Sequence, residues 1–166
     1  VYRRSMGRLL YEALSRPDIQ YAAKDGARHL TGPVETDWWR MHRFAHYLRA
    51  FPVMELSFEL PVWPKFLGVT VDADWAGEVG TRRSTSAGIV GLGDNLLISW
   101  SRTQYCATPS SAEAEYVVMT TAAQEGLFVA HLLEELDLQI EIEVRNDATA
   151  ALSTAARSGL THTKHM

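Results

Sequence analysis

The chain has 166 residues, of which 46% are hydrophobic and 22% charged, and its formal net charge is −4. This composition is typical of a globular protein with one sizeable core, and no run of about 18 uninterrupted apolar residues predicts a membrane span. A single cysteine, Cys106, excludes an internal disulfide framework and a multi-cysteine zinc site.

The first 50 residues predict three helices joined by short turns. Apolar residues recur at helical spacing in three runs, which Pro17 and the pair Gly32-Pro33 separate. The runs comprise Met6, Leu9, Leu10 and Leu14, then Ile19, Ala22 and Ala23, and then Trp38, Met41, Ala45 and Leu48. A less regular connector follows, marked by Pro52, Pro61 and Pro64.

Charge is divided unevenly between these helices and the rest of the chain. Residues 1–50 hold nine Lys/Arg and five acids, a net charge of +4, whereas residues 51–166 hold seven and fifteen, a net charge of −8. A basic first third suits contact with a phosphate backbone, while the acidic remainder suits metal binding. The alternative is that the basic residues only solvate exposed helix faces.

The remainder predicts an α/β fold on a mixed sheet. We expect a strand over 65–72, a hairpin of strands 86–92 and 96–100 closed by Gly93-Asp94-Asn95, and a strand over 140–146. A long helix is expected over 111–136 and a further helix after residue 147. The apolar stripe expected along the long helix comprises Tyr116, Met119, Ala123, Leu127, Ala130 and Leu133. The order strand, strand, strand, helix, strand, helix is typical of an α/β sandwich.

Three acidic residues stand at informative positions in these elements. Asp72 ends the first strand, Glu115 lies early in the long helix, and Asp147 follows the last strand. Carboxylates at such positions can converge in space, and clustered hard oxygen ligands suit Mg²⁺. The pattern therefore predicts a metal-dependent nuclease centre.

Two of these positions have competing interpretations. Ser110-x-x-Glu113 is a capping-box pattern that occupies Glu113 at the helix start, whereas Glu115 shares a face with apolar neighbours and is expected to point towards the sheet. Asp147 would also serve as a plain N-cap, and strict alternation places Asn146 on the buried side of the strand.

Short motifs follow one another in a characteristic order along nearly the whole chain. They are Tyr2 to Tyr11, Arg16 to Ile19, Tyr47 to Arg49, Asp72 to Gly77, Arg82 to Ser86, Ile98 to Ser101, Gln104, Ser110 to Tyr116, and Thr163 to His165. In combination they resemble the ribonuclease H domain of copia-type LTR retrotransposon polyproteins, with the helical connection that joins it to reverse transcriptase.

The resemblance implies a ribonuclease H-like mixed sheet over residues 61–166, preceded by the helical connection over residues 1–60. It implies hydrolysis of the RNA strand of RNA/DNA hybrids during reverse transcription, with two Mg²⁺ ions that Mn²⁺ can replace. The implied partners are the hybrid and the upstream reverse transcriptase domains of the same polyprotein, with no membrane. The implied location is intracellular, in a cytoplasmic particle or the nucleus, and not secreted.

The resemblance also assigns individual residues. It places the metal-bridging role on Asp72 and not on Asp74, which is expected to point to the opposite face or to begin the following loop. It selects Asp147 through the small residues and the histidine that follow it at the family spacing, namely Ala150, Ala151 and His165. A histidine there, His165 or with less support His162, would aid proton transfer or product release, although a solvated histidine is the plain alternative.

Four residues are expected to contact the substrate: Arg82, Arg83, Ser111 and Lys164. For the two arginines the alternative is ordinary charge at the edge of a hairpin. Family members continue with another acid beyond the Lys-His pair, whereas this chain stops at Met166, so we expect a piece of a longer polypeptide without its fourth ligand or its last strand and helix.

Two other functions remain open from the sequence. One is a catalytically inactive remnant that binds nucleic acid or plays a structural part. The other is an integrase or transposase of the DDE type, which is disfavoured because that class orders its acids Asp, Asp, Glu, whereas here Glu115 lies between two aspartates.

Overall fold

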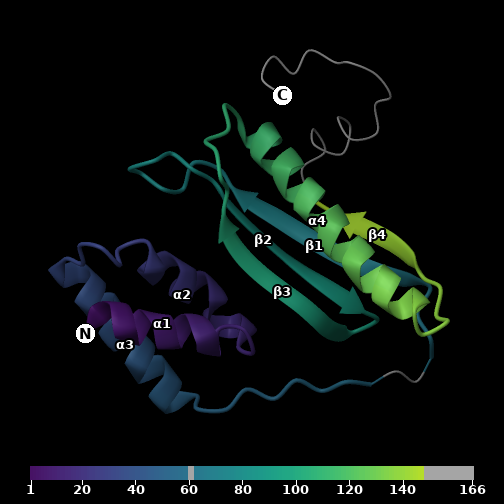
Figure 1. The fold of residues 1–166 in the computed structure, drawn as a ribbon, viewed down its shortest axis with the longest axis horizontal. Coiled ribbons are helices and arrows are strands. Elements are labelled where there is room, and N and C mark those ends of the chain that lie inside the picture. Colours follow the sequence, from purple (N-terminus) through teal and green to yellow (C-terminus); the bar gives the residue numbers. More distant parts are fainter. Residues whose placement is uncertain (60–61, 148–166) are drawn as a thin grey trace. The chain divides into compact units, whose positions relative to one another are not determined.

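The computed structural model describes residues 1–59 and 62–147, and the chain divides into two compact units, Val1–Ser57 and Phe58–Met166. The first unit is helical, and the second is built on a sheet with one long helix (Figure 1). Within the described residues, no helix is long and apolar enough to cross a membrane.

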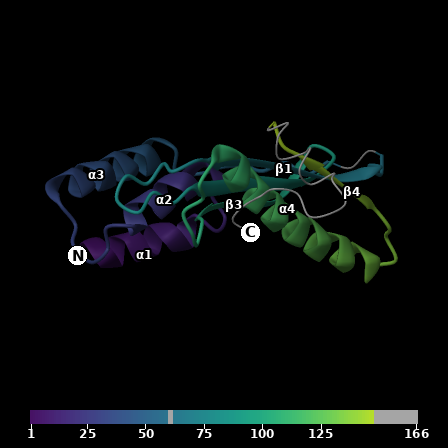
Figure 2. The same ribbon diagram turned by 90° about the horizontal axis from the view of Figure 1, so that it is seen from above.

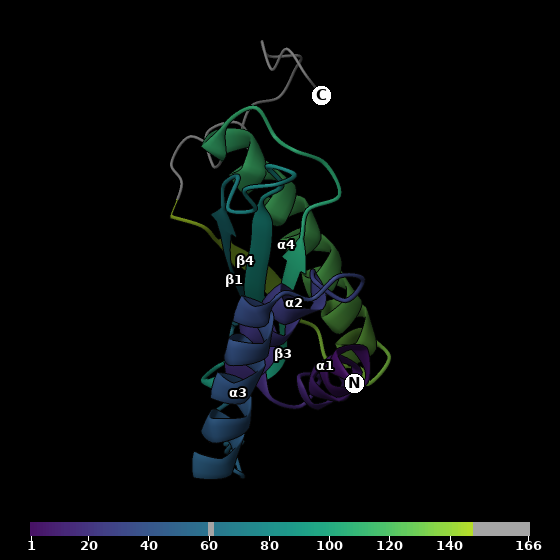
Figure 3. The same cartoon turned by 90° about the vertical axis from the view of Figure 1, so that its left-hand side faces the viewer.

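The helical unit contains the three predicted helices, α1 (Tyr2–Glu12), α2 (Gln20–Ala27) and α3 (Glu35–Ala50), with a short 3-10 helix η1 (Pro17–Ile19) before α2 (Figure 3). Its small core comprises Ala13, Ile19 and Ala23, against which Leu9 and Leu48 pack. α1 and α2 pack closely, because a Cβ on Gly26 would lie 2.6 Å from Cε of Met6.

Asp18 and the buried Asp37 of this unit each have a cationic partner. Asp18 accepts two hydrogen bonds from the Arg16 guanidinium, at 2.9 and 2.7 Å, and these bonds lower the pKa of its carboxyl. Asp37 is only 1% exposed and accepts from the Val34 N–H at 2.9 Å and from Nη1 of Arg40 at 3.2 Å. The first bond caps the start of α3, and the second neutralises the buried charge.

The second unit contains a four-stranded mixed sheet in the order β3-β2-β1-β4. Its strands are β1 (Phe66–Asp74), β2 (Thr85–Leu92), β3 (Asn95–Thr103) and β4 (Glu141–Arg145). β1 pairs antiparallel with β2 and parallel with β4. Gly93 turns the β2–β3 hairpin with a φ of 62°, which a side chain would disfavour. The predicted α/β architecture and hairpin are confirmed, with shifts of one to three residues at the element ends.

Helix α4 (Ser111–Glu134) covers one face of the sheet (Figure 2). Its buried residues are Ala114, Glu115, Val118, Ala122, Gly126 and Val129. The predicted apolar stripe is only partly correct. Met119, Ala130 and Leu133 pack against the core, whereas Ala123 is exposed and Leu127 is 49% exposed. The helix carries apolar residues on most of its circumference, so periodicity alone does not single out the buried side.

α4 lies close to the sheet at Gly126. A Cβ added there would lie 3.1 Å from Cγ2 of Val69 on β1 and 3.0 Å from Cγ2 of Ile142 on β4. Leu67, Val69 and Val71 alternate along β1 to form the core beneath the helix. This packing fixes the helix against the two strands whose ends carry the acidic residues.

Candidate metal centre

Three elements bring their acidic residues to one edge of the sheet. β1 and β4 run parallel, so their carboxyl ends lie on the same side, and the first turns of α4 reach that edge. One carboxylate oxygen from each of Asp72, Glu115 and Asp147 lies within 4.8 Å of the others. The structure thus brings the three predicted carboxylates together, and their role as metal ligands stays a prediction.

Glu115 is the buried member of this group, with 8% exposure. Its Oε1 accepts from the Ala73 N–H at 3.3 Å, and its Oε2 accepts from Nδ2 of Asn146 at 2.8 Å. Burial raises the pKa of the Glu115 carboxyl; the charges of Asp72 and Asp147 raise it further, while the two hydrogen bonds oppose the rise. Within the described part of the chain, no basic side chain forms an ion pair with Glu115.

The donor set fits a hard divalent cation. Three carboxylates supply only oxygen atoms, and the two hydrogen bonds to Glu115 leave further lone pairs on its oxygens for coordination. A bound cation would also offset the like charges that burial makes costly. Carboxylate ligands suit Mg²⁺, Mn²⁺ and Ca²⁺, so the identity of the ion stays a prediction.

Two further side chains hold this arrangement in place. Neither was assigned a role from the sequence. Asn146 orients Glu115, and its place on the inner parity of the last strand was the available signal. Gln104 is 5% exposed, and its Nε2 donates to Oγ of Ser86 at 2.9 Å and to the Ala114 carbonyl at 2.9 Å. These bonds join β2 to the first turn of α4, directly before Glu115.

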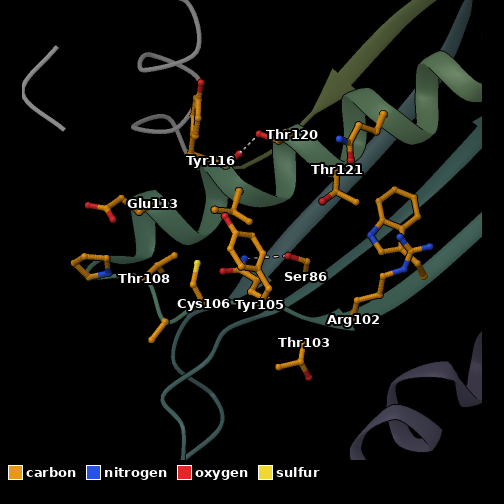
Figure 4. A pocket seen from close by; sticks show the side chains of 16 residues that line it. Ser86, Arg102, Thr103, Tyr105, Cys106, Thr108, Glu113, Tyr116, Thr120 and Thr121 are labelled. Carbon is orange, nitrogen blue, oxygen red and sulfur yellow. Dashed lines mark hydrogen bonds between the residues drawn. The ribbon is translucent and has the colours of Figure 1, made fainter. Parts of the chain in front are cut away.

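The capping-box expectation is only half correct. Ser110 Oγ accepts from the Glu113 N–H at 3.2 Å, but between these two residues no bond returns from the Ser110 N–H to the Glu113 carboxylate. Glu113 instead borders a cavity of about 730 Å³ between β3 and α4, together with Tyr105 and Tyr116 (Figure 4). None of the three converging carboxylates lines this cavity, so Glu113 is separate from the candidate centre.

Of the two alternatives expected for Asp74, the opposite face of the strand is wrong, and a position next to the following loop is nearer to the structure. Asp72 and Asp74 are two residues apart on β1 and share its exposed side, because side chains alternate with a period of two. Asp74 is the last residue of the strand, and a Cβ on Gly77 would overlap its carboxylate. Its side chain therefore lies against the turn that follows β1.

The predicted substrate contacts are placed only in part. Arg82 and Arg83 are exposed in the loop between β1 and β2, at the same end of the sheet as Asp72, and Ser111 is exposed as the first residue of α4. Their contact with a substrate stays a prediction. Lys164, His165 and His162, like the expected helix after Asp147, lie outside the described residues.

Comparison with known proteins gives relatives over most of the chain. The retrovirus-related Pol polyprotein from transposon TNT 1-94 of Nicotiana tabacum is 33% identical over 169 residues, which is 99% of this chain and 12% of the polyprotein. That from transposon RE2 of Arabidopsis thaliana is 34% identical over 140 residues, 84% of this chain and 10% of the polyprotein. Secreted RxLR effector protein 161 of Plasmopara viticola is 32% identical over 130 residues, 77% of this chain and 90% of that protein. No family model matches the chain.

Proposed function

The chain belongs to the family of sequences that includes these retrovirus-related Pol polyproteins, and we propose that it is a metal-dependent ribonuclease H acting on RNA/DNA hybrids. It spans about a tenth of the length of the polyproteins it matches. The observation that supports the proposal most is the meeting of Asp72, Glu115 and Asp147 within 4.8 Å at one edge of a mixed sheet.

In this proposal the second unit is a ribonuclease H-like domain, and the helical unit is the connection from reverse transcriptase. Both act inside the cell, in a cytoplasmic particle or the nucleus, beside the upstream reverse transcriptase domains of one polyprotein. The parallel pairing of β1 with β4 supports this fold, because it places two of the acids at the same sheet edge.

The three carboxylates would hold Mg²⁺ or Mn²⁺. When bound there, a pair of such ions would supply activation of a water molecule and stabilisation of the leaving oxygen. Asp72 and Asp147 are exposed, whereas Glu115 is anchored by Ala73 and Asn146. In the proposal, the two exposed acids would be open to a scissile phosphate, and the anchored one would fix the position of the metal.

Selection of the substrate would depend on groups around this edge. Arg82 and Arg83 offer exposed cations for the phosphate backbone, and the Ser111 hydroxyl lies at the start of α4. Discrimination in favour of the RNA strand would come from its 2′-hydroxyls and from the shape of the hybrid.

A cleavage assay tests the proposal. We expect the protein to cut end-labelled RNA paired to DNA in Mg²⁺, and to leave the same RNA uncut when it is single-stranded or when EDTA is present. Asp72→Asn should abolish cleavage, whereas Asp74→Asn, a matched change two residues away on the same strand, should retain it. Equal cutting of duplex DNA, or loss of activity in Asp74→Asn alone, would contradict the proposal.

If wild type binds Mg²⁺ but cuts no substrate, a catalytically inactive remnant replaces the nuclease. If cutting requires duplex DNA ends, the integrase alternative is favoured. Isothermal calorimetry with Mg²⁺ separates the first of these outcomes from a failure to bind the ion.

A further inference from the structure

Helix α3 carries a continuous cationic face. Five exposed residues lie within about 120° of one another around its axis, given 100° per residue. They are Trp39, His42, Arg43, His46 and Arg49. No acidic residue occurs between positions 38 and 50. The exposed Glu35 lies on the same side of α3 one turn before Trp39, so the face is cationic only from Trp39 to Arg49.

This face is turned away from the core of the helical unit. The opposite side of α3 carries the buried Asp37 and the partly buried Met41, Phe44 and Leu48. Leu48 packs against the small core of the unit. The residues of the cationic face are therefore exposed, although Arg43 also borders a cavity that Asp18 and Asp25 line.

Three acids of this unit are paired with arginines of the same unit. The pairs are Arg16–Asp18, Arg28–Asp25 and Arg40–Asp37, and His29 also lies 3.8 Å from Asp37. Arg43 and Arg49, in contrast, form no ion pair with any described residue. A charged partner from outside the unit would meet them without breaking an existing bond.

One aromatic residue extends the face at its N-terminal end. The Trp39 side chain is 65% exposed, and its ring centroid lies 6.4 Å from that of His42. Unpaired bases stack on exposed aromatic rings next to cationic side chains. The residues from Trp39 to Arg49 extend along about 15 Å of helix, a length over which a duplex presents about nine phosphates.

We propose that this exposed face of α3 binds a nucleic-acid strand, with Arg43 and Arg49 on its phosphates and Trp39 stacked on an unpaired base. The choice of nucleic acid as partner rests on the proposed function. An anionic membrane fits less well, because Trp39 is the only large apolar side chain among the five residues of the face, and helices that lie in a membrane surface present a broad apolar side.

The test measures binding of the full 166-residue chain in EDTA, so that cleavage plays no part. The probe is a fluorescein-labelled RNA/DNA hybrid with a single-stranded DNA overhang, followed by fluorescence anisotropy across a salt series. Arg43→Ala combined with Arg49→Ala should weaken binding roughly 20-fold at 0.1 M salt and flatten the log–log salt slope by about 1.4, which is two single-strand contacts.

A matched control removes the same charge from another helix of this unit. Arg3→Ala combined with Arg4→Ala takes two exposed arginines from α1 and should change affinity by less than about threefold. Trp39→Ala should weaken binding to the overhang probe by about tenfold and leave binding to a blunt hybrid unchanged.

Equal losses from both arginine pairs would show that net charge alone attracts nucleic acid, and would overturn the proposal. An unchanged salt slope in the α3 variant would overturn it as well, as would arginine-dependent binding to phosphatidylserine vesicles in place of the oligonucleotide. Circular dichroism verifies the fold of each variant. A failure of the nuclease assignment is distinguishable, because it would abolish cutting of a blunt hybrid in Mg²⁺ and leave this binding in EDTA intact.

Discussion

The starts of α3 and α4 each bury a carboxylate, and the two are treated in opposite ways. Asp37 accepts hydrogen bonds from the Arg40 guanidinium and from the Val34 N–H, and His29 Nδ1 lies 3.8 Å from its carboxylate. Glu115 has only neutral N–H donors and two further carboxylates beside it. The first acid is neutralised by the chain itself, while the second keeps an excess of negative charge. The difference teaches that burial of an acid indicates a functional site only where the chain supplies no cation.

The largest expected effect is on cleavage of the hybrid, which should depend on Glu115 and not on Asp37. Glu115→Gln should lower cleavage of the hybrid at least about 1000-fold, because loss of a metal ligand removes several kcal/mol of transition-state stabilisation. Asp37→Asn should leave kcat within about twofold. Single-turnover rates at saturating Mg²⁺ measure both, and similar losses in the two variants would remove the distinction.

Metal binding should stabilise the sheet unit, which contains Glu115, and not the helical unit, which contains Asp37. At Mg²⁺ a hundredfold above its Kd, the unfolding free energy should rise by about 2.7 kcal/mol in wild type and in Asp37→Asn. Glu115→Gln should show little of this gain. Denaturant titrations in EDTA and in Mg²⁺ provide the measurement, with a probe in the sheet unit such as the emission of Trp100 isolated by replacing the other tryptophans. A Mg²⁺ effect that survives in Glu115→Gln would place the ion elsewhere.

Removing the self-neutralised acid should cost stability in the helical unit. Asp37→Ala deletes the bonds to the Val34 N–H and to Arg40, and should lower the unfolding free energy by about 2 kcal/mol. Helix loss in urea, followed at 222 nm, reports it. Glu35→Ala, two residues earlier on an exposed position in the first turn of the same helix, is the control and should lose less than about 1 kcal/mol.

The amide that orients Glu115 should affect metal affinity more than fold. Asn146→Ala removes the donor 2.8 Å from Oε2 and should weaken Mg²⁺ binding about tenfold. Asn146→Asp adds a fourth negative charge instead, so it separates loss of orientation from loss of charge. Calorimetric titration compares the three proteins; if Asn146→Ala binds as tightly as wild type, the contact has no positioning role.

The smallest effect concerns pH in the absence of metal. The folded-state pKa of Glu115 is raised by burial, so ionising this carboxyl opposes folding. The penalty is absent below the unfolded pKa and grows as pH rises through the folded pKa. Glu115→Gln in EDTA should therefore match wild type in acid and become the more stable protein towards neutral pH. Equal pH profiles of unfolding free energy would show that the charge is already compensated.

The sequence predicted the elements well where chemistry marks their ends. Prolines and glycines separated the three helices, and the Gly93-Asp94-Asn95 turn placed the hairpin. The stripe on α4 was predicted only in part because Leu127 and Val118 are equally apolar, and only the sheet decides which one is buried. A hairpin with strong turn signals is thus easier to predict than which side of a largely apolar helix faces the sheet.

The candidate site was predictable to the level of its acids and no further. Asp72, Glu115 and Asp147 stand at element ends, and those ends meet. Asn146 and Gln104 act across tertiary contacts between β4, β2 and α4. Strand alternation indicated that Asn146 faces inwards, but it did not identify Glu115 as its partner. Gln104 follows β3, and its sequence position indicates neither of its partners.

The close contact at Gly126 is the point about which α4 would tilt against the sheet. Glu115 lies eleven positions earlier in the helix, which is about 16 Å along the helix axis from Gly126. A methyl group at position 126 would have to displace Val69 or Ile142 or lift the helix, and even a tilt of a few degrees about that point moves the far end by about 1 Å. The absence of a side chain at Gly126 therefore affects the position of the Glu115 carboxylate, three turns earlier in the helix.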